Sequence, residues 1–282
     1  MRRPRAAGRN GGARPIPRKA LGQHFLRDLS VVRRIVDAIG IEPGDALVEV
    51  GPGRGVLSRR LADVSDCLVL VELDPDLAER LRKDFAGAGH VRIVAGDARE
   101  FDPEAIAELV GRPYRMAGNL PYYAAAPIVR RFLELPRPPV GIVVMVQREV
   151  ARAMAAKPGD MTMLSVGVQV YAEPRIVCNV PPGAFSPPPK VHSSVVALKL
   201  RVRPAVAFRP LDAFFGFVRA GFAAPRKTIA NSLSIGLRVP ASTLASRLAE
   251  VAIDPRRRPS TVTIAEWDEL CRTWHASRGW AP

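Results

Sequence analysis

The sequence has little of what would place a protein in a membrane, a secreted scaffold or a metal centre. No apolar run approaches the roughly 18 residues that a membrane helix needs, and the longest, at 140–146, fits a buried strand. The basic N-terminus lacks the apolar segment of a secretory signal. The three cysteines lie far apart, which argues against a disulfide framework and a zinc site, and the four histidines show no ligand spacing. We therefore expect a cytoplasmic protein that binds neither a metal nor a membrane.

Arginine and lysine are concentrated at the two ends of the chain. Residues 1–27 hold eight basic residues and no acidic one, and residues 206–282 hold eleven basic and six acidic residues. Of the net charge of +15, the long middle section at 28–205 carries only +2. Basic ends around a near-neutral centre favour a polyanionic partner, and a nucleic acid over a membrane surface because no basic amphipathic helix stands out. An arginine-biased composition that serves solubility is the alternative.

Three sections of the chain differ in pattern. Residues 1–18 contain Gly, Pro and Arg without apolar periodicity, which predicts a disordered basic tail. Residues 19–205 alternate strand-like and helix-like segments, which predicts an α/β domain with a mostly parallel sheet. Residues 206–282 hold only short amphipathic segments, which predict a small all-helical C-terminal domain. The expected strands are 46–50, 67–73, 91–95, 114–117, 141–147, 175–180 and 194–200, and the expected helices are 31–39, 56–61, 75–85, 125–133, 211–222, 226–233, 241–251 and 264–274.

Glycines and acidic residues follow the first three expected strands. Gly51 and Gly53 come directly after the first strand, but the dinucleotide-binding fingerprint needs a glycine where this chain has Val56. Such a loop can lie against a nucleoside and an amino-acid tail instead of a pyrophosphate. Glu72 ends the second strand, where a carboxylate can bind both ribose hydroxyls, and Asp97 follows the third, where it can accept an adenine amino hydrogen. In this order the three strand ends predict a class I (Rossmann-like) methyltransferase site, although each feature alone is also an ordinary turn or cap.

Asn119, Leu120, Pro121 and Tyr122 follow the fourth expected strand. The exocyclic amine of adenine is a poor nucleophile because its lone pair is delocalised into the ring. The side-chain oxygen of Asn119 and the carbonyl of Leu120 can accept its two N–H hydrogens and favour a pyramidal nitrogen. Pro121 stiffens the loop, and Tyr122 offers a flat surface for a base turned out of its stack. We expect catalysis here, although Asn and Pro are also common in plain turns.

A proline-rich segment at 182–191 is a second candidate for the base pocket. Phe185 can form its other aromatic wall, and Lys190 can contact a phosphate. A rigid linker is an equally good interpretation of the prolines.

Together these motifs resemble the small-subunit ribosomal RNA adenine dimethyltransferase family over roughly residues 16–275. The resemblance rests on segments 19–26, 51–55, 71–74, 96–98, 118–122, 185–191 and 226–233, in that order. It implies successive methyl transfer from S-adenosylmethionine to the N6 amines of two adjacent adenosines near the 3′ end of small-subunit rRNA. The product is N6,N6-dimethyladenosine, and the substrate is a 30S-type ribosome assembly intermediate. We expect the enzyme to be monomeric when free.

The resemblance also assigns residues to roles. Those expected in the cofactor site are His24, Leu26, Gly51, Gly53, Glu72, Leu73, Asp97, Ala98 and Asn119. Those expected to bind RNA are Lys190, Arg226 and Lys227. The chain departs from the family at two places: His24 stands where members usually have asparagine, and 123–126 replaces Asn-Ile-Ser/Thr.

Other functions remain open on sequence alone. The large-subunit rRNA adenine methyltransferases of the macrolide-resistance type share the fold and most motifs, but the 226–233 segment and Leu120 resemble the small-subunit group more. A mainly non-catalytic ribosome-assembly factor is a second alternative. A nucleotide-dependent dehydrogenase is disfavoured by Val56, and the loop at 119–122 differs from the usual DNA adenine methyltransferase motif.

Overall fold

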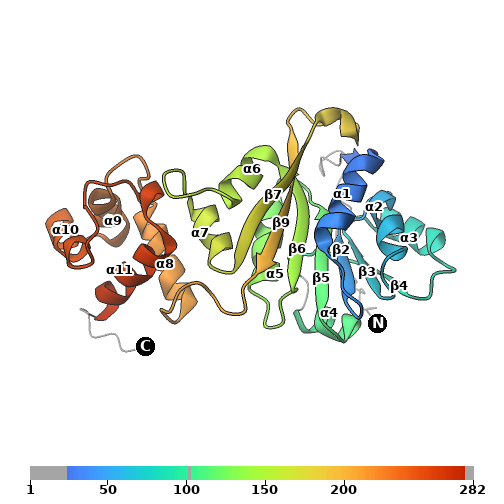
Figure 1. Cartoon of the computed structure of the whole chain (residues 1–282), viewed down its shortest axis with the longest axis horizontal. Helices are drawn as coiled ribbons and strands as arrows, with labels where there is room; N and C mark the ends of the chain where they lie inside the picture. The colour runs from blue at the N-terminus through green and yellow to red at the C-terminus, as the bar shows by residue number, and fades with distance from the viewer. Residues whose placement is uncertain (1–23, 101–102, 277–282) are drawn as a thin grey trace, which may run out of the picture.

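The computed structural model describes residues 24–100 and 103–276. Within them, a seven-stranded sheet with helices on both faces is joined at one side by a group of helices from the C-terminal part of the chain (Figure 1). The predicted basic tail at 1–18 and the segment 19–23 lie outside the described residues.

The sheet has the order β4-β3-β2-β5-β6-β9-β7. Its strands are β2 (Ala46–Val50), β3 (Leu68–Glu72), β4 (Val91–Ala95), β5 (Tyr114–Asn119), β6 (Gly141–Gln147), β7 (Ala172–Val180) and β9 (Ser193–Leu200). Strands β2 to β6 run parallel, and β9 runs antiparallel to both of its neighbours, β6 and β7. Chain order reverses between β2 and β5, and ligands of open α/β sheets bind at such a reversal.

Two apolar cores lie on the two faces of this sheet. One face is covered by α1 (Leu29–Ile39), α2 (Val56–Ala62) and α3 (Pro75–Asp84), and the other by α4 (Pro103–Val110), α5 (Ala125–Leu133) and α6 (Arg148–Met154). Every residue of β2 and β3 is buried, as expected for parallel strands covered on both sides. Asp28 caps α1 by accepting the backbone N–H of Ser30 at 2.8 Å.

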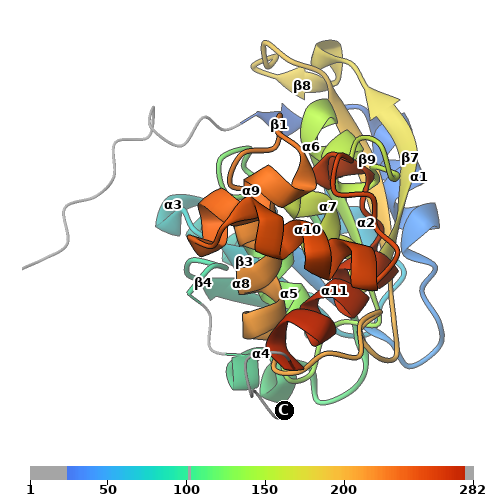
Figure 2. The same cartoon turned by 90° about the vertical axis from the view of Figure 1, so that its left-hand side faces the viewer.

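The C-terminal helices pack around aromatic side chains. They are α8 (Leu211–Gly221), α9 (Ile229–Leu237), α10 (Ala241–Glu250) and α11 (Ile264–Ala276), and they stand in front of the sheet in Figure 2. Trp267 is fully buried among them. A Cβ on Gly221 would come within 2.2 Å of the Trp267 ring, so only glycine lets α8 approach α11 this closely.

Helix α7 (Met163–Gln169) lies between the sheet and the C-terminal helices in Figure 1 and connects the two. Val166 and Val170 belong to the core of the C-terminal helices although they precede the predicted boundary at residue 205. The backbone N–H groups of Gly159 and Met161 donate to the carbonyl of Ser260 at 2.8 and 3.1 Å. The boundary in the sequence is therefore not a gap in the packing.

Several elements differ from the sequence prediction. Helices α4, α6 and α7 were not predicted, nor was the two-stranded ladder between β1 (Phe25–Leu26) and β8 (Phe185–Ser186). Helix α9 begins at 229 and not at 226, because Thr228 is its N-cap and accepts the backbone N–H of Asn231. Arg226 and Lys227 consequently lie in the loop that precedes the helix.

Candidate active site

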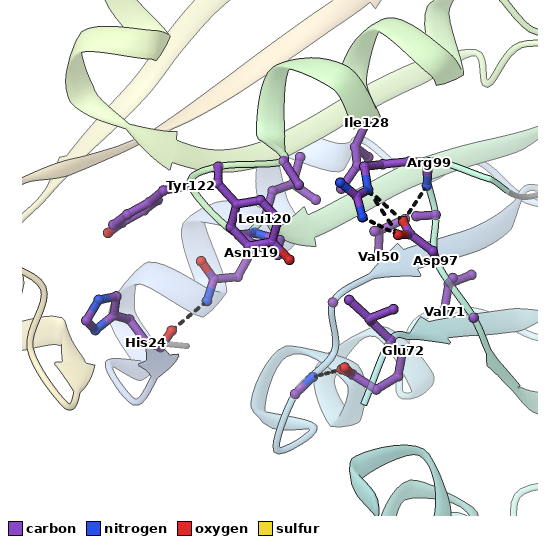
Figure 3. Close-up of a pocket in the computed structure, with 18 of the residues that line it drawn as sticks. His24, Val50, Val71, Glu72, Asp97, Arg99, Asn119, Leu120, Tyr122 and Ile128 are labelled. Atoms are coloured by element: carbon purple, nitrogen blue, oxygen red, sulfur yellow. Dashed lines mark hydrogen bonds and ion pairs between the residues drawn. The ribbon is translucent and has the colours of Figure 1, made fainter. Parts of the chain in front are cut away.

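A cleft opens at the carboxyl ends of β2, β3, β4 and β5 (Figure 3). Its empty space, including the mouth, is about 820 Å³, which is the size range of pockets for nucleoside-sized ligands. The residues predicted for the site that line it are His24, Gly51, Gly53, Glu72, Leu73, Asp97, Ala98, Asn119, Leu120, Pro121 and Tyr122. Phe25, Arg99 and Tyr123 also line it, and no pattern in the sequence predicted a role in the site for them.

Two predicted site residues do not line the cleft. Leu26 is 6% exposed and Phe185 is 2% exposed, and both pack in the core beneath α1. They face each other in the ladder between β1 and β8, where apolar side chains turn to the core. The packing therefore does not support Phe185 as a wall of the base pocket. Lys190, Arg226 and Lys227 are exposed and lie outside the cleft.

The glycine turn after β2 packs backbone against backbone on the end of β5. Gly51 and Gly53 have φ of 72° and 56°, values that residues with a side chain rarely adopt. A Cβ on Gly51 would come within 3.2 Å of the Asn119 carbonyl oxygen, and one on Gly118 within 2.3 Å of the Val50 carbonyl oxygen. Glycine at these positions brings Asn119 beside the turn.

Glu72 points a buried carboxylate into the cleft from the end of β3, as Figure 3 shows. The side chain is 4% exposed. One oxygen accepts the backbone N–H of Gly53 and the other that of Asp74, each at 2.9 Å. Burial raises the pKa of Glu72, and these two hydrogen bonds oppose the rise. Each carboxylate oxygen keeps a further lone pair, so Glu72 can still accept two hydroxyl hydrogens.

Asp97 is held by Arg99, two residues further along the same turn after β4. The Nε of Arg99 donates to both carboxylate oxygens at 3.0 Å, and the backbone N–H of Arg99 donates to Oδ1 at 2.9 Å. These bonds lower the pKa of Asp97, which keeps it an ionised acceptor. The Arg99 guanidinium also lies 5.9 Å from the ring centre of Tyr123, a residue from the loop after β5.

Asn119 is anchored from outside its own loop. Its Nδ2 donates to the backbone carbonyl of His24 at 3.0 Å, so its Oδ1 is turned away from that carbonyl and is free to accept a hydrogen from a ligand (Figure 3). The Tyr122 hydroxyl lies 2.7 Å from the Ser193 hydroxyl, which fixes the ring at the cleft. Burial raises the pKa of Tyr122, so the phenol stays neutral.

The described residues offer neither a metal site nor a membrane span. No group of three or more His, Cys, Asp or Glu side chains among them is placed to hold a metal ion. In the same part of the chain, no helix has the length and apolar character needed to cross a bilayer.

A doubly covered parallel sheet with an antiparallel strand, a glycine turn and acidic residues at successive strand ends define a class I methyltransferase. The chain belongs to the ribosomal RNA adenine dimethylase family, whose sequence model matches residues 17–269. This match confirms the family and enzyme class predicted from the sequence, and the sheet with its C-terminal helices confirms the predicted fold class.

Named relatives agree with this family. A protein of Moorella thermoacetica named ribosomal RNA small subunit methyltransferase A is 41% identical over 268 residues, which cover 92% of each chain. A relative of the same name from Dehalococcoides mccartyi is 39% identical over 256 residues, covering 90% of this chain and 87% of the relative.

Two solved structures share the fold. The 23S rRNA methyltransferase ErmE has a TM-score of 0.70 at 28% identity, covering 88% of this chain and 98% of that one. A dimethyladenosine transferase from Plasmodium falciparum has a TM-score of 0.76 at 21% identity, with 91% and 98% covered.

Proposed function

We propose that this protein transfers methyl groups from S-adenosylmethionine to the N6 amines of two adjacent adenosines near the 3′ end of small-subunit rRNA. The product is N6,N6-dimethyladenosine, and the substrate is an assembly intermediate of the small subunit in the cytoplasm, which the enzyme meets as a monomer. One observation carries the chemistry: Asn119, anchored by the His24 carbonyl, presents a free oxygen at the cleft between the glycine turn and Tyr122. The names of the most similar relatives support the choice of RNA.

The cleft fits S-adenosylmethionine. Its buried Glu72 carboxylate suits two ribose hydroxyls, and the ionised Asp97 suits an adenine amino group. In the turn after β2, Gly51 and Gly53 carry no side chain beyond hydrogen, so a ligand can come close to their backbone. When bound, the cofactor supplies a methyl group on a positively charged sulfur, which makes that methyl electrophilic.

The protein then has to prepare the amine. The Asn119 Oδ1 accepts one amine hydrogen and the Leu120 carbonyl accepts the other, which localises the nitrogen lone pair. Tyr122 stacks on the adenine and holds its nitrogen toward the glycine turn. The methylated ammonium is acidic and loses its proton to water, so no strong base is needed. Alignment of the reacting atoms supplies most of the acceleration.

Large-subunit rRNA remains the second candidate substrate, because ErmE shares this fold over most of the chain. Its 28% identity compares with about 40% for the small-subunit relatives. An RNA-binding role without catalysis is disfavoured because Glu72, Asp97 and Asn119 line one cleft.

Labelling of ribosomal particles tests the proposal. Purified protein and methyl-labelled S-adenosylmethionine are incubated with small-subunit or large-subunit particles that lack the modification, and the labelled nucleoside is identified. We expect label in N6,N6-dimethyladenosine of the small subunit only. Label confined to the large subunit would overturn the assignment.

The Asn119→Ala variant tests the chemistry in the same assay. Loss of an acceptor aimed at the reacting amine should lower kcat about 100-fold, with the Kd for the cofactor within a few-fold of wild type. Asn179→Ala is the matched control, because Asn179 is an exposed residue of the edge strand β7 and accepts from the Ser194 hydroxyl. Equal turnover of the two variants would remove Asn119 from its role.

A further inference from the structure

His24 lies where three segments of the site meet. Its backbone carbonyl accepts the Asn119 amide at 3.0 Å, and its ring centre is 5.8 Å from that of Tyr122. Its ring Nδ1 is 2.8 Å from the backbone carbonyl oxygen of Pro187, which belongs to the segment after β8. One residue therefore connects the catalytic loop with the proline-rich segment.

The imidazole acts as a donor in this arrangement. A carbonyl oxygen can only accept, so Nδ1 of His24 carries the hydrogen and donates it to Pro187. The Nδ1 hydrogen is thereby engaged in a hydrogen bond within the protein. It is not available to bind the carboxylate or hydroxyl of a ligand.

The hydrogen bond from the His24 ring holds a part of the backbone that has little strand pairing. The ladder between β1 and β8 pairs only Phe25 with Ser186 and Leu26 with Phe185, and so short a ladder is weak by itself. On its far side, the backbone N–H of Arg27 donates to Ala184 at 2.9 Å and holds that end. On the near side, the ring of His24 supplies the hydrogen bond to the proline-rich segment.

The orientation of Asn119 depends on this carbonyl. An amide group has a donor end and an acceptor end, and the donor end of Asn119 is bound to His24. If the His24 carbonyl shifts, the amide rotates and its oxygen no longer points along the same line into the cleft. A misplacement of about 1 Å in a reacting group can cost a large factor in rate.

We propose that the His24 imidazole is a positioning residue for methyl transfer, which fixes Asn119 by holding its own backbone against Pro187. This inference rests on the proposed function. His24 then differs from a cofactor ligand, because loss of its side chain lowers kcat and leaves the Kd for the cofactor unchanged.

Three substitutions separate the donor from the ring. His24→Asn places an amide nitrogen at the same δ position as Nδ1, so it keeps the donor but loses the ring. His24→Phe keeps a ring beside Tyr122 but loses the donor. His24→Gln keeps an amide donor but moves it one bond further out. We expect kcat near wild type for asparagine and about tenfold lower for phenylalanine and glutamine, with the Kd for S-adenosylmethionine within twofold in all three.

His90→Phe is the matched control. The Nε2 of His90 lies 3.1 Å from the Ala62 carbonyl, beside the amino end of β4, so this change removes the same type of hydrogen bond away from the cleft. It should leave kcat unchanged while lowering the melting temperature at least as much as His24→Phe does.

The outcomes are distinct. Unchanged kcat in both His24→Phe and His24→Gln overturns the proposal. A loss of kcat in His24→Asn as large as that in His24→Phe also overturns it. A tenfold weaker cofactor Kd with unchanged kcat at saturating cofactor makes His24 a ligand and overturns it too. If His24→Phe does not fold, the comparison of asparagine with glutamine decides. A wild-type protein that methylates no adenine counts against the proposed function, whichever variant is compared.

Discussion

The carboxyl group of Glu49 should make the stability of the sheet depend on pH. Glu49 lies on β2, beneath the glycine turn, and is 1% exposed. Its Oε2 has no hydrogen-bond partner among the described residues. Burial raises its pKa from 4.5 to about 8, with the nearby Glu72 adding to the rise and the Ser58 hydroxyl opposing it. The folded protein therefore holds Glu49 protonated at neutral pH.

The sign and size of the effect follow from proton linkage. Between its unfolded pKa of 4.5 and its folded pKa of about 8, Glu49 takes up a proton on folding. The raised pKa means that this contribution to stability is complete at low pH and is lost as pH rises, at about 1.4 kcal/mol per pH unit. Between about pH 5.5 and 7.5 wild type should lose roughly 3 kcal/mol that Glu49→Gln does not lose.

Urea unfolding followed by far-UV circular dichroism measures this difference. Glutamine brings an extra N–H that costs about 1–3 kcal/mol if unpaired, so the slope with pH is compared and not the value at one pH. Glu108→Gln, at an exposed position of α4, is the control and should parallel wild type. Parallel curves for wild type and Glu49→Gln would refute the reasoning. The tryptophans, at 267, 274 and 280, all lie in the C-terminal section and give a separate fluorescence signal for it.

Two further substitutions test the packing of the site. Gly118→Ala would push a Cβ to 2.3 Å from the backbone oxygen of Val50, so it should lower the free energy of unfolding by about 1–3 kcal/mol and abolish most methyl transfer. Gly183→Ala is the control and should do neither, because a Cβ there has open space around it. Similar melting temperatures for the two variants would contradict the close contact at Gly118. Phe185→Leu should lower stability by about 1 kcal/mol and leave kcat unchanged, because the ring packs in the core. A loss of kcat without a loss of stability would instead restore Phe185 as a wall of the base pocket.

The grouping of the cleft residues could be predicted because the order of parallel strands determines it. Gly51, Glu72, Asp97 and Asn119 each lie at or just beyond the carboxyl end of a strand, and the carboxyl ends of parallel strands meet at one edge. Alternation of strand and helix patterns was therefore enough to place them together. Their roles toward a ligand stay a prediction, since juxtaposition alone does not show binding.

Other features depend on contacts that no local pattern encodes. Phe185 beside prolines fits a pocket wall and a core position equally well, and only its pairing with Leu26, far away in the sequence, turns it inward. Helices α6 and α7 have seven residues each, too few for a clear apolar period. Arg99 gave no signal either, because its role at the cleft depends on where the Asp97 carboxylate points.

We propose that the choice of RNA is encoded outside the cleft. The fold of a 23S rRNA methyltransferase covers 88% of this chain, so the architecture that holds a cofactor and an adenine serves more than one target. The exposed Arg226 and Lys227 precede α9. The C-terminal helices share a core with Val166 of α7 and with Val170, which directly follows α7. A basic surface held in this way can set which adenosine reaches Asn119 without changing the chemistry there. Under this proposal, selection of the RNA by the helical surface and catalysis at the strand ends are separable properties of one chain.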